Sequence, residues 1–235
     1  MTEKPVLIMG SAPSVTACAA WPRSRFSAII AINNAWQIRP DWTHHIAPDD
    51  FPHERAPKTL EPDQMRVMSS AYVPANNHFG GVLYAGGTMA FTAGYWALAT
   101  LKPRAIIFAG CDMIYPQSGP THFYGTGTAD PLRNDISLRN LEAKSARLLL
   151  HAATRNCACM RFDAPQSRLL FPTVTSDSFA KPVRAPNAKR FAAAKTAEER
   201  LGYYVPSGRY WESGISFSPE KIDNIDALWL GALAG

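Results

Sequence analysis

The chain has 235 residues, of which 46% are hydrophobic and 18% are charged, and its formal net charge is +5 at pH 7. This length suffices for one α/β domain with an appendage, and the composition excludes a disordered protein. The sequence shows no apolar run near the roughly 20 residues that span a bilayer and no recognisable secretory leader. We therefore expect a cytoplasmic protein without a transmembrane segment.

The first predicted element is an apolar strand over residues 5–9, followed by the turn Gly10-Ser11-Ala12-Pro13-Ser14. Gly10 allows a ligand to approach the backbone closely. The hydroxyls of Ser11 and Ser14 can bond phosphate or sugar oxygens, and Ser14 can also cap a helix that follows. The turn has neither the G-x-G-x-x-G fingerprint nor a Walker A sequence, which argues against a dehydrogenase-like or kinase-like site.

Further apolar runs recur along the chain with helical segments between them. Several runs are continuous, which is typical of central strands covered on both faces. This alternation predicts an α/β fold with a doubly wound, mostly parallel, Rossmann-like sheet. The predicted strands after the first are 27–32, 43–47, 65–69, 104–109 and 158–162, and the predicted helices are 88–101, opened by Gly86-Gly87-Thr88, and 136–155, capped by Asp135.

Residues 113–134 are rich in glycine and proline and directly follow a predicted strand. A loop of about 20 residues inside a compact domain is uncommon and usually functional. We expect a lid that rises from the ligand-binding edge of the sheet. Tyr115, His122 and Tyr124 lie in it: tyrosine hydroxyls can hold a phosphate, and a histidine can act as an acid or a base.

From about residue 173 the prolines and a basic run predict an extended arm, followed by a last helix to about residue 233. The run 181–200 contains six basic residues, including Lys181 and Arg184, against two acidic ones. Such a segment is either a solvated surface or a contact for polyanions. The division is thus a nucleotide-binding domain over 1–172 with its lid at 113–134, and a basic arm and helix over 173–235. Apolar positions in the last helix, namely Ile222, Ile225, Leu228 and Trp229, would dock on the core or on a second copy in a homo-oligomer.

Polar residues follow several predicted strands. Asn33 and Asn34 end the second, Asp49 follows the third, and Asp112 follows the strand before the lid. Parallel strands bring these residues and the bare N–H groups of the first turn to one edge of the sheet, where phosphates and ribose bind. The sequence therefore predicts a nucleotide site, although the asparagines and Asp49 are also suited to capping helices.

Neither the histidines nor the cysteines follow a metal-ligand spacing. His44 and His45 are neighbours in a predicted strand and so point to opposite faces. The cysteines, at positions 18, 111, 157 and 159, are expected to be buried thiols. We expect no metal site and no covalently bound cofactor; Asp49, Asp50 and Asp112 become candidate magnesium ligands only under an alternative function.

These motifs, taken in order over roughly residues 5–172, resemble the Campylobacter-type bacterial sialyltransferases and the related glycosyltransferase-like and hydroxymethylpterin pyrophosphokinase-like proteins. Gly10 to Ser14 matches the family's Gly-x-Gly-Pro-Ser turn, and Asn33 or Asn34 matches its nucleotide-contacting asparagine. Gly86-Gly87-Thr88 resembles the family's Thr-Ser-Gly turn before a buried helix. Gly110-Cys111-Asp112 with Tyr115 matches a strand that ends Gly-x-Asp and is closely followed by tyrosine, and Thr121 to Gly125 resembles the lid motif Ser-His-Tyr-x-Gly. The family's catalytic histidine follows the lid glycine, where this chain has Thr126, and His122 matches a preceding histidine. Asp49-Asp50 replace a family asparagine that reads the base.

The resemblance implies a metal-independent transferase with a CMP-sugar donor and a saccharide-type acceptor. Tyr115 or Tyr124 would hold the donor phosphate and His122 would deprotonate the acceptor. Gly10, Ser11, Ser14, Asn33, Asn34, Asp49, Gly87, Thr88 and Asp112 would line the nucleotide site. The alternatives are a magnesium-dependent pyrophosphokinase-like enzyme and a non-catalytic nucleotide- or nucleic-acid-associated protein that uses the basic arm.

Overall fold

The computed structural model describes residues 4–164, 166–176, 178–179, 183 and 185–234 and contains a single sheet of seven strands. The strand order is β4-β3-β2-β1-β5-β6-β7, and all the pairings are parallel. Helices flank the sheet, which confirms the predicted Rossmann-like α/β fold. The strands are β1 (Val6–Met9), β2 (Ala28–Ile32), β3 (His44–Ile46), β4 (Met65–Val67), β5 (Ala105–Ala109), β6 (Ala158–Phe162) and β7 (Thr173–Val174).

The six strands predicted from apolar runs are all present, and the central ones fill the two hydrophobic clusters on the faces of the sheet, whereas only Val67 of β4 is buried. Every residue of β1 and β2 is buried, as expected for strands covered on both faces. The seventh strand was not predicted. It pairs Thr173 with Arg161 of β6 and so extends the sheet past the expected domain end at residue 172.

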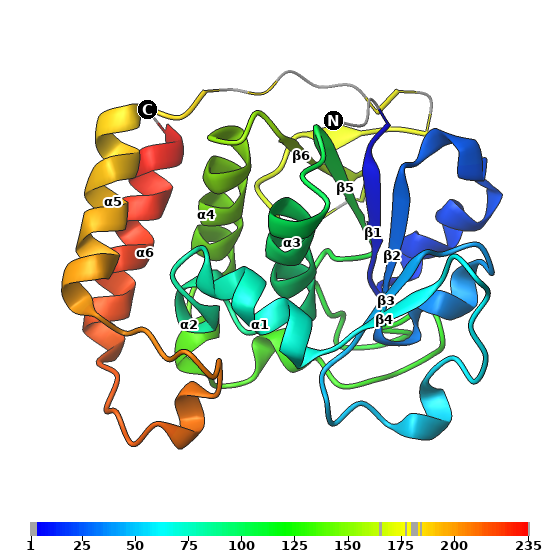
Figure 1. Cartoon of the computed structure of the whole chain (residues 1–235), viewed down its shortest axis with the longest axis horizontal. Helices are drawn as coiled ribbons and strands as arrows, with labels where there is room; N and C mark the ends of the chain where they lie inside the picture. Colours follow the sequence, from blue (N-terminus) through cyan, green and yellow to red (C-terminus); the bar gives the residue numbers. More distant parts are fainter. Residues whose placement is uncertain (1–3, 165, 177, 180–182, 184, 235) are drawn as a thin grey trace.

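The two faces of the sheet are covered differently. One face packs against α1 (Ser69–Asn77), α3 (Met89–Thr100) and α4 (Leu141–Ala153), with the short α2 (Val82–Ala85) alongside them (Figure 1). The other face is covered by the 3₁₀ helix Pro13–Ala20 and by aromatic side chains that include Trp21, Phe26 and Trp42. Among the helices of the described residues, none is both long enough and apolar enough to cross a membrane.

Two predicted helix starts are corrected. Ser14 does not cap a helix: it lies inside the 3₁₀ helix, and its hydroxyl donates to Asp112 Oδ2 at 2.9 Å. The predicted helix 136–155 is split in two. Asp135 caps the 3₁₀ helix Ile136–Leu138, and Asn140 caps α4 by accepting from the Ala143 N–H.

The expected extended arm is wrong over residues 188–201, which form α5 (Ala188–Leu201). Helix α5 packs on α6 (Pro219–Ala234), and both lie outside α4 as a third layer (Figure 1). Ile222, Ile225 and Trp229 are buried in this layer as predicted, whereas Leu228 is exposed. Lys181 and Arg184 of the basic run lie outside the described residues.

Two ion pairs, both buried, attach the third layer to α4. Arg147 Nε lies 2.7 Å from Glu198 Oε1 of α5, and Lys144 Nζ lies 2.7 Å from Asp226 Oδ1 of α6. Pairing is needed because a buried charge without a partner is costly. These contacts orient the two outer helices relative to the domain.

The chain reverses its direction of winding between β1 and β5. Strands β2, β3 and β4 extend from β1 to one side, while β5, β6 and β7 extend to the other, so the loops after β1 and β5 diverge and leave a crevice at the carboxyl edge. The Gly10 N–H donates to the Ala109 carbonyl at 2.8 Å, and the Ala12 N–H donates to the Gly110 carbonyl at 2.9 Å. A Cβ on Gly10 would lie 2.3 Å from the Gly110 oxygen, which explains the need for glycine there.

Candidate functional site

A cavity of about 780 Å³ opens at this crevice. Its walls come from the turn after β1, the residues after β2, the segment after β3, the start of α3 and the loop after β5. Ligand sites of α/β sheets form at such a switch point, and their usual volume is about 300–1,000 Å³. The structure brings these predicted site residues together in the lining: Gly10, Ser11, Asn33, Asn34, Thr88, Tyr115, His122 and Tyr124.

Asp112 and Ser14 were predicted to bind ligand, but both lie outside the cavity lining that the described residues form. The Asp112 side chain is buried and accepts the hydrogen bond from Ser14. Burial raises the pKa of Asp112, although the bond from Ser14 opposes that shift. Their contact ties the turn after β1 to the end of β5, which is a structural role.

Asp49 and Gly87 also lie outside that lining. The Asp49 carboxylate accepts hydrogen bonds from the Ser69 hydroxyl at 2.5 Å and from the Ser69 N–H at 3.3 Å. It therefore holds the start of α1 from a distant part of the chain, and it does not cap the helix that follows it, His53–Arg55, whose N-cap residue is Pro52. The Gly87 N–H donates to Ser137 Oγ at 3.0 Å and its carbonyl accepts from Arg133, so Gly87 joins the start of α3 to the far end of the 113–134 loop.

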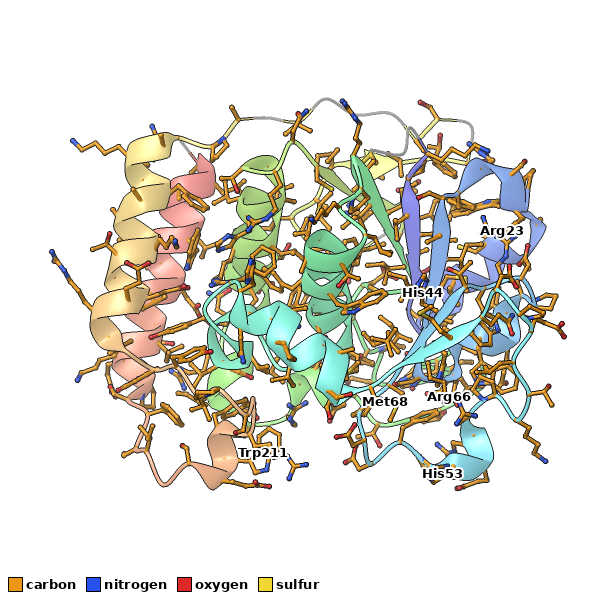
Figure 2. The ribbon with its side chains drawn as sticks, in the orientation of Figure 1. Arg23, His44, His53, Arg66, Met68 and Trp211 are labelled. Atoms are coloured by element: carbon orange, nitrogen blue, oxygen red, sulfur yellow. The ribbon has the colours of Figure 1, made fainter. Side chains whose placement is uncertain are left out.

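The two asparagines after β2 are held by backbone geometry. Asn33 has a φ of 52°, a left-handed conformation that asparagine tolerates better than most residues. His45 Nε2 donates to the Asn33 carbonyl oxygen at 2.8 Å. The ring of His44, which is labelled in Figure 2, packs on Trp96 of the helix α3 that covers the other face of the sheet. The two histidines thus face opposite sides of the sheet, as predicted. Asn34 is 6% exposed and lines the cavity, where its amide can bond a base or a sugar.

The segment 113–134 lies along the cavity and is fastened to the first turn. The Phe123 N–H donates to the Ser11 carbonyl at 2.9 Å. His122 and Gly125 exchange two backbone hydrogen bonds of 2.9 and 3.0 Å, and the φ of +118° at Gly125 requires glycine in this tight turn. The turn places His122 and Tyr124 against the cavity.

His122 is buried against two tyrosine rings and the Thr121 hydroxyl. It is 5% exposed, its ring stacks on Tyr124 with centroids 5.0 Å apart, and Tyr115 lies 5.9 Å away. Burial lowers the pKa of His122 below its ordinary value, so the imidazole is neutral at pH 7. Burial also raises the pKa of Tyr115, which keeps its hydroxyl as a hydrogen-bond donor. A neutral imidazole beside a phenol can take a proton and stabilise a developing anion.

The prediction missed the residues that give the cavity its fixed charges. Arg55 and Asp130 line it from the segment after β3 and from the 113–134 loop, and Gln37, Thr126 and Thr128 add polar groups. Arg55 lies in a proline-rich loop, and this loop has no hydrophobic periodicity from which its path back to the cavity could be predicted. The one signal in the sequence was a cationic side chain close to the carboxyl end of a predicted strand.

Metal-ligating residues are not grouped anywhere in the part of the chain that the structure describes: no cluster of three or more His, Cys, Asp or Glu side chains could hold an ion. Asp49, Asp50 and Asp112, the magnesium candidates, therefore do not form such a cluster. The four cysteines are free and buried, as expected.

The cavity thus combines the turn after β1 at a switch point, a helix start, an arginine and a buried histidine with two tyrosines. The Gly10 and Ala12 N–H groups, which were expected to be free for a ligand, instead donate to the Ala109 and Gly110 carbonyls. Comparisons of this chain with protein-family models, with curated proteins and with solved structures found no match.

Proposed function

We propose that this protein is a nucleotide-dependent transferase, in particular a sialyltransferase-like glycosyltransferase that uses a CMP-type sugar donor. The observation that carries the proposal is the composition of the cavity at the β1–β5 switch point. One wall is suited to a nucleotide phosphate, and the facing loop carries a neutral histidine between two tyrosines.

The donor phosphate would bind near the start of α3. Thr88, Met89 and Ala90 line the cavity there, and the first amides of a helix carry partial positive charge that attracts anions. Arg55 adds a full positive charge to the same cavity. Asn34 and the turn at Gly10 would contact the nucleoside, in keeping with the usual position of ribose at this edge.

The transfer step would use His122 as the base. Its ring would take the proton of an acceptor hydroxyl while that oxygen forms a bond to the anomeric carbon of the donor sugar. The bond between the anomeric carbon and the phosphate oxygen breaks, and the electron pair leaves with the nucleotide. Tyr115 or Tyr124 would donate a hydrogen bond to that phosphate, which stabilises the charge of the leaving group.

The loop 113–134 would serve as the lid, because transfer to a saccharide competes with hydrolysis. Its bond from Phe123 to the Ser11 carbonyl holds it over the cavity, and His122 is almost fully buried beneath Tyr124. A site that excludes water favours transfer to the bound acceptor.

The proposal is tested by a thermal-shift panel of CMP, CDP, UDP, GDP, ATP, NAD and S-adenosylmethionine, each with and without magnesium. A ligand that binds the native state raises the midpoint, by about 2.7 kcal/mol of stabilisation at 100 times its dissociation constant. We expect a magnesium-independent shift with CMP. A magnesium-dependent shift with ATP would replace the proposal by the pyrophosphokinase-like alternative, and no shift with any nucleotide would overturn both.

A matched pair of arginine variants locates the site. Arg55→Gln removes the charge that lines the cavity and should reduce the CMP shift. Arg200→Gln removes an exposed arginine of the basic helix α5 and should leave the shift unchanged. The opposite pattern would favour the alternative in which the basic segment binds polyanions.

A further inference from the structure

The Thr121 hydroxyl contacts His122 and Gly127, and these contacts play no part in the proposed reaction described above. The Thr121 hydroxyl oxygen is 2.8 Å from His122 Nδ1 and 2.9 Å from the Gly127 nitrogen, and it is 3.3 Å from the Gly127 carbonyl oxygen. Thr121 is 8% exposed and His122 is 5% exposed. In such a buried place each polar contact restricts where the protons lie.

The protons can be counted. A hydroxyl has one proton to donate and two lone pairs that accept. The Gly127 N–H can only donate, so it occupies one lone pair of the Thr121 oxygen. The Gly127 carbonyl can only accept, so its contact needs the single hydroxyl proton. The contact with His122 Nδ1 then has only the second lone pair left, and Nδ1 must bring its own proton.

The other neutral tautomer of His122 cannot satisfy all three of these hydrogen bonds. If Nε2 carried the ring proton, Nδ1 would need the Thr121 hydroxyl proton, and the Gly127 carbonyl would lose it. All three contacts are satisfied together only when Nδ1 is protonated. The backbone at Gly127 lies directly against the imidazole ring. A Cβ on Gly127 would lie 2.7 Å from His122 Nδ1, so only glycine fits there.

We infer that Thr121 is a positioning residue that holds neutral His122 in the Nδ1–H tautomer and leaves the Nε2 lone pair as the free acceptor of this cavity-lining ring. The catalytic meaning of this inference rests on the proposed function. There, Nε2 is the atom that takes the acceptor proton, and the imidazolium that results keeps its Nδ1–H bond to Thr121. The tautomer itself is a property of the protein without any ligand.

The test is a long-range ¹H–¹⁵N correlation spectrum of the full chain with ¹⁵N-labelled histidine, recorded at a pH where His122 is neutral. The six histidines are distinguished by the loss of one set of signals in His122→Gln. We expect the wild-type signals of His122 to show a protonated Nδ1 and an unprotonated Nε2. A spectrum with the proton on Nε2 would overturn the inference, whatever the variants show.

Two substitutions at Thr121 separate positioning from packing. Thr121→Ser keeps the hydroxyl and should keep the Nδ1–H pattern. Thr121→Val keeps the shape but removes the acceptor, so the ring proton should move to Nε2. If Thr121→Val is folded and His122 still shows Nδ1–H, Thr121 does not set the tautomer. If Thr121→Val does not fold, the wild-type and Thr121→Ser spectra decide, and loss of the pattern in Thr121→Ser would count against the inference.

This experiment fails independently of the proposed function. It uses no nucleotide, so the absence of any thermal shift would leave the tautomer result standing. Conversely, an Nε2–H ring together with a clear CMP shift would keep the nucleotide site and remove Nε2 as the base.

Discussion

Removal of the Tyr210 hydroxyl should loosen the connection between the C-terminal layer and the cavity. Tyr210 precedes Trp211 in the segment between α5 and α6, at the edge of the molecule toward which the strands run (Figures 1 and 2). Its oxygen lies 2.8 Å from both carboxylate oxygens of Asp135 and 3.0 Å from Ser137 Oγ. Ser137 in turn accepts the N–H of Gly87. One hydroxyl thus anchors the end of the 113–134 loop and the start of α3.

The magnitude follows from the number of bonds lost. Tyr210→Phe keeps the buried ring, which is 4% exposed, and removes one hydrogen bond to a carboxylate. A hydrogen bond to a charged group contributes about 1.5–3 kcal/mol to stability. For a chain of this size each kcal/mol shifts the thermal midpoint by about 2–4 °C, so we expect a loss of about 3–12 °C.

The pH dependence gives a second readout. Burial would raise the pKa of Asp135, but hydrogen bonds from Ser137 and Tyr210 and the charge of Arg133 outweigh it and lower that pKa overall. The folded chain therefore favours the carboxylate more than the unfolded chain does. This stability is present above about pH 4, the unfolded pKa, and is lost as the pH falls through the folded pKa. The deficit of Tyr210→Phe should accordingly shrink in acid.

Urea and thermal unfolding of the wild type, Tyr210→Phe and Tyr204→Phe provide the assay. Tyr204 is 45% exposed, and its hydroxyl forms no hydrogen bond with the described residues, so it is the matched control. We expect Tyr204→Phe to change the free energy of unfolding by less than about 0.5 kcal/mol. Equal losses in the two variants, or a Tyr210→Phe deficit that does not narrow in acid, would refute the reasoning.

Three further predictions concern the glycine at the crevice, a buried ion pair and a buried histidine. Gly10→Ala forces the loops after β1 and β5 apart and should cost about 1–3 kcal/mol or more, with loss of any CMP shift. Gly231→Ala meets no atom within 4 Å and lies inside α6, so it should stabilise the chain slightly, by up to about 1 kcal/mol; equal unfolding midpoints of the two variants would contradict this. Lys144→Met should cost about 3–5 kcal/mol because Asp226 loses its buried partner, and Lys144→Met with Asp226→Leu should recover most of it; a double-mutant cycle without coupling would argue against the pair. Burial lowers the pKa of His151 well below its ordinary value, so the unfolded chain takes up a proton that the folded chain resists. Stability should then fall as the pH drops below about 6.5, and His151→Phe should flatten that fall; parallel curves of urea midpoint against pH would show that His151 is not responsible.

The strands were predictable because they depend on local sequence. Continuous apolar runs such as Val6–Met9 identify buried strands whatever their partners are. Strand β7 has only two residues, and its pairing with β6 depends on the path of the chain after Phe162. No local pattern carries that information.

Helix α5 was missed although its boundaries carry ordinary signals. Asn187 accepts the N–H of Arg190 as an N-cap, and Gly202 ends the helix with a φ of 67°. The basic residues and the flanking prolines suggested an extended arm instead. The helix does have an apolar stripe, because Phe191, Ala194, Ala197 and Leu201 pack in the third layer. The stripe is mostly alanine, and the buried Glu198 beside it is charged and pairs with Arg147, so the hydrophobic pattern is weak.

The location of the candidate site could be predicted better than the side chains that line it. The order of turns and strand ends located the crevice, and residues such as Gly10 and His122 do line it. The Asp112 side chain bonds Ser14 and does not line the cavity. The sequence places Asp112 just after a strand but does not tell whether its side chain points into the crevice or toward the neighbouring turn. Arg55 reaches the cavity from a segment without periodicity, and only the three-dimensional path brings it there.

The pairing of β1 with β5 has a consequence for how the chain matures. Val6 aligns with Ile106, so the two halves of the central pair lie roughly one hundred residues apart in sequence. During synthesis, β1 can pair with β2 well before its other edge finds β5. Until β5 arrives, the hydrogen-bonding groups on that edge of β1 stay open to wrong partners. The crevice can therefore take shape only after β5 has been synthesised, and a chain truncated before residue 105 would leave one edge of β1 unpaired where the whole chain has its cavity.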